Sequence, residues 1–568
     1  MHVVTRVGTT LLALSLWGCT PDDGLSFRAR FGYLPRSIEG PCPSQPVAKP
    51  NYTAEIDTFR VQVTAPGQAA LRKDFPTVDL ADKARLQLDG VQAGTGRNIQ
   101  VNGLLGKVGL WRGVHLGVNI EAGQQTEVGV LITRLAAMTC SRSPMTSGRV
   151  FASATPLADG RVLLAGGFFE IANVNCPDTS PNCRKYTATP TAEIYDPFKG
   201  TFSSVGDLIE ARGLHKAALL SDGRVLLVGG AGELRYDPAQ SFPLVPSLHR
   251  VAMEIFDPVT SSFSAGPDDP DFVPRVFHTV TRLDDGRLLI AGGGAQVSAA
   301  DASKKTALCQ VAGGQVVCTS SSPMRYPRIG HTATLLDDGR VFVWGGVTDA
   351  GASGTSCDSA GVTQCPEWWR PDLDARGEPA FVAVDVGNPV GGAGPASNLF
   401  FAAATRIGSY GVVIAGGLLR DGSTLPLQFL PPTDSAFLYA NYIETIGNSV
   451  GGPPFRMGGP RLLHEAVPLG VDGRGFFAGG YRDLGLTPSN RFDIFDAAGD
   501  SGQQGGFMPD ITVAEESVLL RQARGGLSLV HVGGGAVVAI GGEDKDGNGN
   551  HMVVDTAEIY TDKLEPQL

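Results

Sequence analysis

The stretch RGLHKAALLSDGRVLLVGG, residues 212–230, decides the fold because versions of it recur along the chain. Two apolar runs flank Asp222-Gly223, a dipeptide that favours tight β-hairpins. The second run, Val225–Val228, is apolar without alternation, as expected for a strand that is covered on both faces. A diglycine then closes the run. The stretch therefore predicts a hairpin whose second strand is buried between stacked sheets.

The diglycine recurs seven times, at intervals of 53 to 71 residues. Its first glycines are Gly166, Gly229, Gly292, Gly345, Gly416, Gly479 and Gly541. Several copies continue into a third strand with an aromatic-Asp-Pro ending, such as Tyr195-Asp196-Pro197, and then a more polar fourth strand. Such periodicity is typical of arrays and propellers. Copies five and seven depart from the pattern, because neither has an Asp-Gly-Arg turn and copy seven has Gly533–Gly535 in its place.

The two ends of the repeated region complement each other. The last copy stops soon after its third strand, at residues 556–560, whereas an extra strand-like piece at residues 137–143 precedes the first copy. We expect this piece to serve as the fourth strand of the last sheet. Joining both ends of the region in one sheet leaves no exposed edge.

The pattern R-x-x-H-x-[AT], then D-G-R-V, G-G and Y-D-P, resembles the kelch repeat, over residues ~138–562. The resemblance implies a seven-bladed β-propeller of the kind found in galactose oxidase and its relatives. The copper site of those oxidases is not expected here, because the chain lacks their adjacent Tyr-His pair and all of its cysteines after Cys19 can be paired. The expected fold class is all-β: a seven-bladed kelch β-propeller preceded by a small β-sandwich-like domain.

Four segments follow from this organisation. Residues 1–19 are predicted to be a lipoprotein signal peptide, 20–50 a Pro-rich tether with one strand at Leu25–Phe31, 51–135 the β-sandwich-like spacer domain and 136–568 the propeller. Short alternating runs such as Phe59-Arg-Val61-Gln-Val63, separated by Gly-rich turns, favour the sandwich over an irregular β-domain without excluding the latter.

The signal peptide has Arg6 before an apolar run that is too short to span a membrane. It ends in Leu16-Trp17-Gly18-Cys19, which resembles the bacterial lipobox, although Trp17 stands where a small residue is usual. The resemblance implies lipidation of Cys19 and an outer-membrane location in the cell envelope. An ordinary secreted protein, or a chance cysteine, is the alternative.

The other eight cysteines agree with export, because disulfides persist in oxidising compartments. They fall into the pairs Cys42 and Cys140, Cys176 and Cys183, Cys309 and Cys318, and Cys357 and Cys365. Eight cysteines allow 105 pairings, so local pairing is a hypothesis. For Cys309 and Cys318 a Gly313-Gly314 hairpin turn places the two residues opposite each other, which favours a disulfide over two buried thiols.

The charge of the chain bears on which partners it can bind. Of 568 residues, 46 are Lys or Arg and 57 are Asp or Glu, for a net charge of −11, which disfavours nucleic acid as a partner. No G-x-S-x-G, H-E-x-x-H or phosphate-loop motif occurs, so we expect no enzyme.

Two series of polar residues recur with the repeat. The histidines are His215, His278, His331 and His464, and the arginines are Arg149, Arg212, Arg275, Arg328, Arg461 and Arg524. A ring of imidazoles suits a transition metal, and a ring of arginines suits an anion. Because both series repeat with the sheets, we expect them instead to pack each sheet and bind its backbone or acids.

Non-repeated material follows the diglycines, at residues 168–190, 231–250, 347–370 and 418–433. All four segments join second to third strands, so we expect them to emerge on one face as a recognition surface. Trp368 and Trp369 are the ligand-binding candidates on it, and packing beneath the loop is their alternative.

The final copy contains Asp544, Asp546, Asn548, Asn550 and Asp555, which fit the alternating oxygen ligands of a calcium loop. Asp-Gly-Asn-Gly is also a common turn sequence, so a plain hairpin is the alternative.

The function expected is that of an envelope lipoprotein, anchored by lipid, whose propeller binds a protein or glycan without catalysis. A carbohydrate-active enzyme and a purely structural component are the alternatives.

Overall fold

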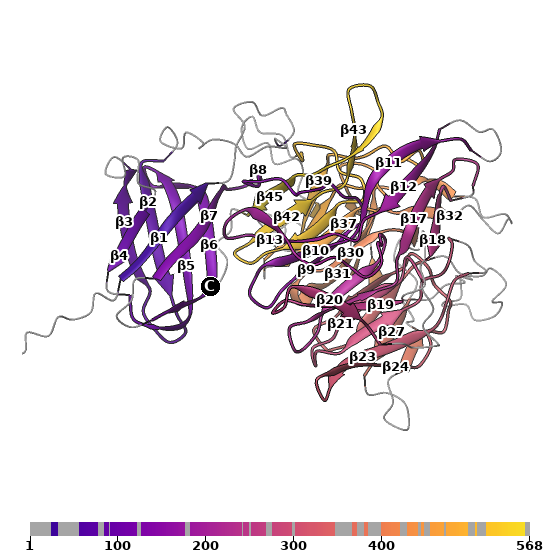
Figure 1. Cartoon of the computed structure of the whole chain (residues 1–568), viewed down its shortest axis with the longest axis horizontal. Coiled ribbons are helices and arrows are strands. Elements are labelled where there is room, and N and C mark those ends of the chain that lie inside the picture. The colour runs from indigo at the N-terminus through magenta and orange to yellow at the C-terminus, as the bar shows by residue number, and fades with distance from the viewer. Residues whose placement is uncertain are drawn as a thin grey trace, which may run out of the picture.

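The computed structural model describes residues 24–31, 42, 56–77, 85–89, 91–121, 126–176, 182–240, 242–248, 252–267, 275–297, 301–346, 366–371, 380–383, 399–420, 429–440, 445–447, 455–470, 473–497, 506–507 and 519–562. In these residues the chain is all-β, as predicted, apart from a three-residue 3-10 turn at Gly408–Tyr410. No helix in this part of the chain is long and apolar enough to cross a membrane. Figure 1 shows one sheet of N-terminal strands beside a larger group of small sheets.

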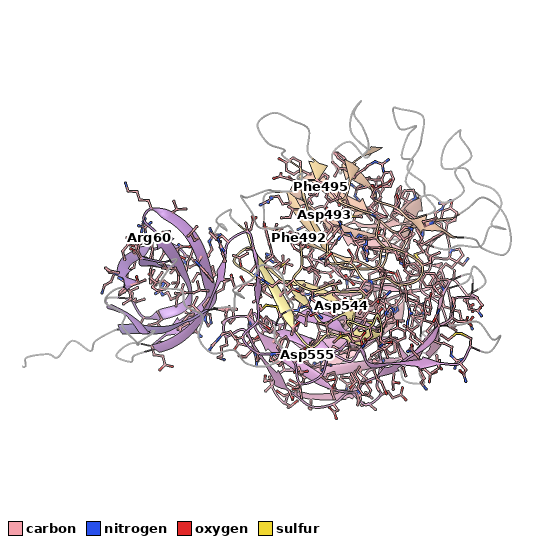
Figure 2. All side chains as sticks on the ribbon, turned by 90° about the horizontal axis from the view of Figure 1, so that it is seen from above. Arg60, Phe492, Asp493, Phe495, Asp544 and Asp555 are labelled. Carbon is pink, nitrogen blue, oxygen red and sulfur yellow. A yellow bond between two sulfur atoms is a disulfide. The ribbon has the colours of Figure 1, made fainter. Side chains whose placement is uncertain are left out.

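The N-terminal sheet has seven strands in the order β3-β2-β5-β6-β7-β1-β4. Their bounds are β1 Gly24–Phe31, β2 Thr58–Thr64, β3 Leu71–Pro76, β4 Arg85–Asp89, β5 Gly94–Leu105, β6 Val108–Ile120 and β7 Thr126–Arg134. Phe59, Val61 and Val63 alternate with more exposed neighbours along β2 and point into one apolar core. In Figure 2 the strands curve around this core.

Strand β1 corrects the predicted tether. It lies within residues 20–50, but it pairs in parallel with β7 and antiparallel with β4, so it belongs to the N-terminal sheet. The strand expected at Leu25–Phe31 is therefore present. Its place in the sheet was not predicted, because its pairing partners are far away along the chain.

Seven further sheets, here numbered 1 to 7, each contain a row of four antiparallel strands, and sheet 5 has a fifth strand. Their strands are β9 Ser153–Pro156, β10 Val162–Ala165, β13 Ala192–Asp196 and β14 Thr201–Ser204 in sheet 1; β15 Lys216–Leu219, β16 Val225–Val228, β19 Met253–Asp257 and β20 Ser262–Ala265 in sheet 2; β21 Thr279–Arg282, β22 Leu288–Ala291, β23 Thr306–Ala312 and β24 Gln315–Ser320 in sheet 3; β25 Thr332–Leu335, β26 Val341–Trp344, β27 Glu367–Arg370 and β28 Ala380–Ala383 in sheet 4; β30 Ala403–Arg406, β31 Gly411–Ala415, β34 Ser435–Ala440 and β35 Thr445–Gly447 in sheet 5, where β36 Phe455–Arg456 also pairs with β34; β37 Glu465–Pro468, β38 Arg474–Ala478, β39 Phe492–Asp496 and β40 Gly506–Phe507 in sheet 6; and β41 Ser528–His531, β42 Ala536–Ile540, β45 Ala557–Thr561 and β8 Met138–Cys140 in sheet 7.

Two predictions about these sheets are confirmed. The second strand of sheet 2, Val225–Val228, is buried at every residue, and it forms a hairpin with β15 across the Asp222-Gly223-Arg224 turn. Strand β8 pairs antiparallel with β45, so residues from before the first repeat complete the last sheet.

Backbone hydrogen bonds join each of these sheets to the next. The second glycine of each diglycine donates its N–H to a carbonyl of the following sheet, over 2.7 to 3.0 Å. The seven bonds run from Gly167 to Arg212, Gly230 to Arg275, Gly293 to Arg328, Gly346 to Leu399, Gly417 to Arg461, Gly480 to Arg524, and Gly542 to Arg149. The seventh bond thus leads from sheet 7 back to sheet 1. The innermost strands β9 and β41 also contact each other.

The first glycine of each diglycine is required by this close approach. At Gly229 the backbone has a φ of +67°, and a Cβ would lie 2.3 Å from the carbonyl oxygen of Arg275. No L-residue fits both conditions without moving the neighbouring sheet. The repeated diglycine is therefore the sequence signature of sheet-to-sheet contact.

The N-terminal sheet packs on sheets 1 and 7. Arg112 donates to the carbonyl of Asp562 over 3.1 Å, and the His115 ring stacks on Phe198 at a centroid distance of 3.9 Å. A Cβ added to Gly534 would lie 2.8 Å from the Val114 side chain. The absence of an Asp-Gly-Arg turn in copy seven therefore makes room for the N-terminal sheet.

Insertions between second and third strands, together with a short strand that precedes the first strand of sheet 5, form a further layer. Strands β11 Phe168–Val174, β12 Cys183–Ala188, β17 Ala231–Tyr236 and β18 Leu244–Leu248 pair as an insertion sheet, β29 Leu399–Phe400, β32 Leu418–Arg420 and β33 Phe429–Pro432 form a second, and β43 Glu543–Lys545 and β44 His551–Val553 form a hairpin. In Figure 1 they gather on one side of the seven sheets. Their buried side chains share one apolar core with the chain just before the first strands.

Three disulfides lie in the described residues: Cys42–Cys140, Cys176–Cys183 and Cys309–Cys318. Cys309 faces Cys318 in the register that the Gly313-Gly314 turn predicted. These three pairs match the predicted ones.

Candidate functional site

The repeated arginines are structural. Arg212 is fully buried, donates to the Gly229 carbonyl over 2.8 Å, and forms an ion pair with Glu254 at 2.6 Å. The equivalent acids for Arg149, Arg328, Arg461 and Arg524 are Glu193, Glu367, Asp493 and Glu558. Four of the arginines thus tie the first glycine of the diglycine to the third strand of the same sheet: Arg149, Arg212, Arg328 and Arg524. Arg275 donates to the Gly292 carbonyl, and Arg461 donates to the Arg491 carbonyl. This confirms the packing interpretation and leaves these side chains unavailable to an anion in solvent.

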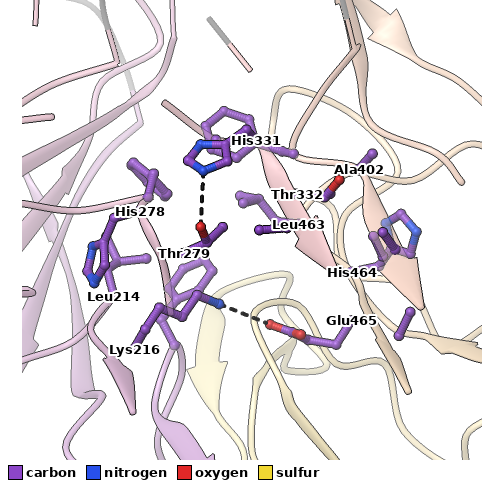
Figure 3. Close-up of a pocket in the computed structure, with 18 of the residues that line it drawn as sticks. Leu214, Lys216, His278, Thr279, His331, Thr332, Ala402, Leu463, His464 and Glu465 are labelled. Carbon is purple, nitrogen blue, oxygen red and sulfur yellow. Dashed lines mark hydrogen bonds and ion pairs between the residues drawn. The ribbon is translucent and has the colours of Figure 1, made fainter. Parts of the chain in front are cut away.

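The repeated histidines connect neighbouring sheets. His215 of sheet 2 bonds through Nε2 to the Ser153 hydroxyl of sheet 1 at 2.8 Å, and His331 of sheet 4 to the Thr279 hydroxyl of sheet 3 at 3.1 Å (Figure 3). Burial lowers the pKa of His215 and of His331 to about 3, so both rings stay neutral at physiological pH. No cluster of three metal-binding side chains among the described residues includes any of these histidines. His215 and His331 therefore link neighbouring sheets, which agrees with the packing interpretation for these two histidines.

A cavity of about 290 Å³ lies between the first strands of the sheets. Its floor is formed by the second residue after each repeated arginine, or the residue equivalent to it: Phe151, Leu214, Phe277, Gly330, Phe401, Leu463 and Gly526. The five non-glycine members have φ values between +50° and +59° and pack toward the core shared with the insertions. The cavity is therefore closed on the side of the insertion sheet.

Two charged side chains line the cavity. Lys216 of β15 and Glu465 of β37 face each other at 3.9 Å, and their side chains are 49 % and 44 % exposed (Figure 3). An ion pair this long and this exposed contributes little to stability, because water screens it. Thr279 and Thr332 add hydroxyl groups to the same wall. The arrangement offers a carboxylate, an ammonium group and hydroxyls to a small polar ligand.

The sequence analysis did not single out Lys216 or Glu465. They occupy one repeated position, four residues after the arginine, where the other sheets have Ser153, Thr279, Thr332, Ala403 and Ser528. The signal that was available is the departure from the repeat: charge appears in two copies only, and these copies are not adjacent in the chain.

Trp368 and Trp369 do not form an exposed platform. Both lie on β27 of sheet 4, where Trp369 is fully buried and Trp368 is 6 % exposed. Trp368 packs in the core between sheets 4 and 5, and Trp369 in the core on the other face. Their assignment as ligand-binding residues is therefore wrong, because the aromatic pair fills the third strand of a sheet.

The predicted calcium ligands do not surround one point. Asp546 lies in the turn of the β43–β44 hairpin, where its carboxylate accepts hydrogen bonds from the backbone N–H groups of Asn548 and Asn550. Asp555 follows the end of β44, at the opposite end of the hairpin, and Figure 2 shows it apart from Asp544. In the described residues no cluster of three metal-binding side chains includes these acids. The geometry therefore favours the plain hairpin over the calcium loop.

The one cluster of that kind holds no free site. It consists of Cys176, Cys183 and Asp237, and the two sulfurs are bonded to each other. The lipidation candidate Cys19 and the pair Cys357 and Cys365 lie outside the described residues.

The predicted recognition loops are in large part folded. Residues 168–174, 183–188, 231–236 and 244–248 are strands of the insertion sheet, and most of residues 347–370 lie outside the described part.

Compared with known proteins, the chain matches no family model and no curated protein.

Proposed function

We propose that sheets 1 to 7 are the blades of a closed, seven-bladed propeller of the kelch kind in an exported envelope lipoprotein anchored through Cys19. The seven backbone bonds between successive sheets support closure, because the last of them returns from Gly542 to Arg149. Completion of sheet 7 by β8 supports it as well, since it joins the two ends of the repeated region in one sheet.

The propeller acts as a non-enzymatic binding module, and its cavity takes a sugar-sized polar group of a glycan. The observation that carries this proposal is the loose Lys216–Glu465 pair inside a cavity of about 290 Å³. Sugar hydroxyls donate to a carboxylate and accept from an ammonium group, so one ring satisfies both charges. Separating the pair costs little because it is weak.

The buried histidines support binding rather than catalysis. A pKa of about 3 makes the His215 and His331 rings poor general bases near pH 7, because proton transfer is most effective from a group that titrates near the working pH. Their Nε2 atoms are also engaged with Ser153 and Thr279.

The test is a glycan array followed by calorimetry with the full-length protein. We expect Lys216→Met and Glu465→Gln each to weaken binding of the selected glycan at least tenfold. The control is Lys185→Met on the insertion sheet. It removes the ion pair between Lys185 and Glu233, whose charged atoms lie 2.6 Å apart and whose side chains are similarly exposed. Unchanged affinity in the two cavity variants, or no glycan bound, contradicts the proposal. Turnover of a bound sugar makes the protein an enzyme instead.

Anchoring is tested separately. We expect the parent protein to sediment with membranes and Cys19→Ala to be released into the soluble fraction. Release of both forms contradicts the lipoprotein assignment and leaves the cavity proposal untouched.

A further inference from the structure

One repeated position carries a charge in a single sheet. This position directly follows the diglycine. Its residue forms an isolated antiparallel β-bridge with the residue that follows the repeated arginine, as Phe168 does with Val150. The described occupants of this position are Phe168, Ala231, Gly294, Leu418, Tyr481 and Glu543. All are buried, and Glu543 is the one carboxylic acid among them. Because the repeat does not require a carboxylate there, Glu543 calls for a local explanation.

Three other buried polar side chains converge on Glu543. The Tyr186 hydroxyl of the insertion sheet lies 3.5 Å from Glu543 Oε1, and His551 Nδ1 of β44 lies 3.5 Å from the same atom. Tyr481, which directly follows the diglycine of sheet 6, lies in the same buried cluster as Tyr186, and burial followed by the charge of Glu543 raises the pKa of its phenol well above the usual value. Tyr186, Tyr481 and Glu543 are fully buried.

These groups are poorly satisfied by one another. Glu543 Oε2, the Tyr481 hydroxyl and His551 Nδ1 are buried without a hydrogen bond of ordinary geometry. Each such atom costs about 1–3 kcal/mol when it is left unpaired in the interior, so native proteins rarely gather three of them. A buried hydroxyl also lacks a partner at Tyr195, but it stands alone in an apolar core. The convergence at Glu543 points to a bound group.

The spacing indicates what that group is. Hydrogen bonds between oxygens are about 2.5–3.0 Å long, shorter than the 3.5 Å found here. Ligand atoms that surround a metal ion tetrahedrally at about 2.0–2.2 Å lie roughly 3.3–3.6 Å apart. We propose that Tyr186, Tyr481, Glu543 and His551 hold a transition-metal ion, with ferric iron as the favoured species.

The donor set selects the metal. One imidazole suits iron, copper, nickel or zinc, and hard anionic oxygens favour ions of higher charge. A carboxylate and two phenolates carry three negative charges, which balance a trivalent ion. Arg184 Nε lies 3.4 Å from the Tyr186 hydroxyl and lowers the pKa of that phenol in part, but burial, followed by the charge of Glu543, keeps this pKa well above its usual value. The ion itself therefore has to displace the phenolic proton. Binding releases the phenolic protons, so affinity falls as the pH is lowered.

The site has one less buried side and a structural role. The His551 side chain, on the β43–β44 hairpin, is 6 % exposed and is the least buried of the four side chains. The ligands come from the insertion sheet, sheet 6 and this hairpin, so the ion ties the insertions together. The site lies outside the Lys216–Glu465 cavity, and it does not depend on glycan binding.

The experiment is equilibrium dialysis of the metal-free, full-length protein against ferric nitrilotriacetate, followed by metal analysis and visible absorption. We expect one iron per chain and a phenolate-to-iron charge-transfer band. Tyr186→Phe and Tyr481→Phe are expected to weaken binding at least tenfold and to reduce the band, because each removes one hydroxyl and keeps the ring. Glu543→Gln is expected to abolish binding.

The matched control is Tyr195→Phe, which removes a buried, unpartnered hydroxyl elsewhere. It is expected to bind iron as the parent does. Circular dichroism before dialysis establishes that each variant is folded. The proposal is overturned if the parent binds no iron, if iron binds without the charge-transfer band, or if the two tyrosine variants bind as tightly as the control.

Discussion

Sheets 2 and 5 solve one packing problem in two ways. In sheet 2 the buried space between the diglycine and the third strand holds the ion pair of Arg212 and Glu254, whereas in sheet 5 the same two positions are Leu399 and Phe437, in one apolar core. The backbone does not change with them. Gly346 still donates to the Leu399 carbonyl over 3.0 Å, as Gly230 does to that of Arg275 over 2.9 Å.

The comparison separates what the repeat requires from what it tolerates. The diglycine backbone contact is present in all seven sheets, while the side chains beneath it vary: sheet 5 replaces both members of the pair, and sheet 3 keeps Arg275 with Ala307 at the position of the acid. Removing one partner of a buried ion pair is costly, whereas an apolar pair of suitable volume can replace both partners. The following predictions test that distinction.

The largest effect is expected from breaking the ion pair on one side. Glu254→Ala leaves the Arg212 guanidinium buried without its carboxylate, and we expect the free energy of unfolding to fall by about 3–5 kcal/mol. The double variant Arg212→Leu with Glu254→Phe imitates sheet 5 and is expected to be more stable than Glu254→Ala alone. Urea unfolding measures both. A double variant that is the less stable of the two contradicts the exchange seen between the sheets.

The backbone contact is tested by Gly229→Ala. The added Cβ would lie 2.3 Å from the Arg275 carbonyl oxygen, in addition to the strain of a φ of +67°. We expect a loss of about 2–4 kcal/mol, from strain and displacement of the next sheet. Gly223→Ala is the control, because that glycine has a φ of +90° but nothing within 4 Å of its added Cβ. Equal losses in the two variants would show that backbone strain alone explains the diglycine.

The histidines add a dependence on pH. Burial lowers the folded-state pKa of His331 to about 3, below its ordinary value of 6.5. Between these values the unfolded chain binds the additional proton, so stability falls as the pH is lowered from about 6.5 toward 3. From pH 7 to pH 5 the loss for one such histidine is about 2 kcal/mol. We expect His331→Gln to reduce the pH dependence of urea unfolding by that amount, and an unchanged slope counts against a neutral buried ring.

The smallest effect concerns the β43–β44 hairpin. Its Asp546 carboxylate already accepts hydrogen bonds from backbone N–H groups. We therefore expect the protein to have the same thermal midpoint in millimolar Ca²⁺ as in chelator. The double variant Asp544→Ala with Asp546→Ala is expected to respond in the same way. A Ca²⁺-dependent rise in the parent that the variant lacks would restore the calcium loop, because only a ligand of the folded state raises the midpoint.

The structure of sheets 1 to 7 was predicted from local sequence patterns. The Asp-Gly turns, the apolar second strands and the seven diglycines predicted the hairpins and their register, down to Cys309 opposite Cys318. The same local patterns predicted the candidate sites less well. Trp368 and Trp369 were assigned to a surface because their neighbours do not repeat, although the strand they form is an ordinary third strand.

The sequence by itself determined the all-β class, the repeated hairpins and the strand that completes sheet 7, because each follows from turn chemistry and the periodicity of apolar residues. Only the tertiary structure decided that β1 joins the N-terminal sheet, that Lys216 meets Glu465, and that Tyr186 and Tyr481 converge on Glu543. Tyr186 and Glu543 are 357 residues apart in the chain. Hydrophobic periodicity reports which face of a strand is buried, whereas the contacts between distant polar residues depend on how the sheets are placed around one another.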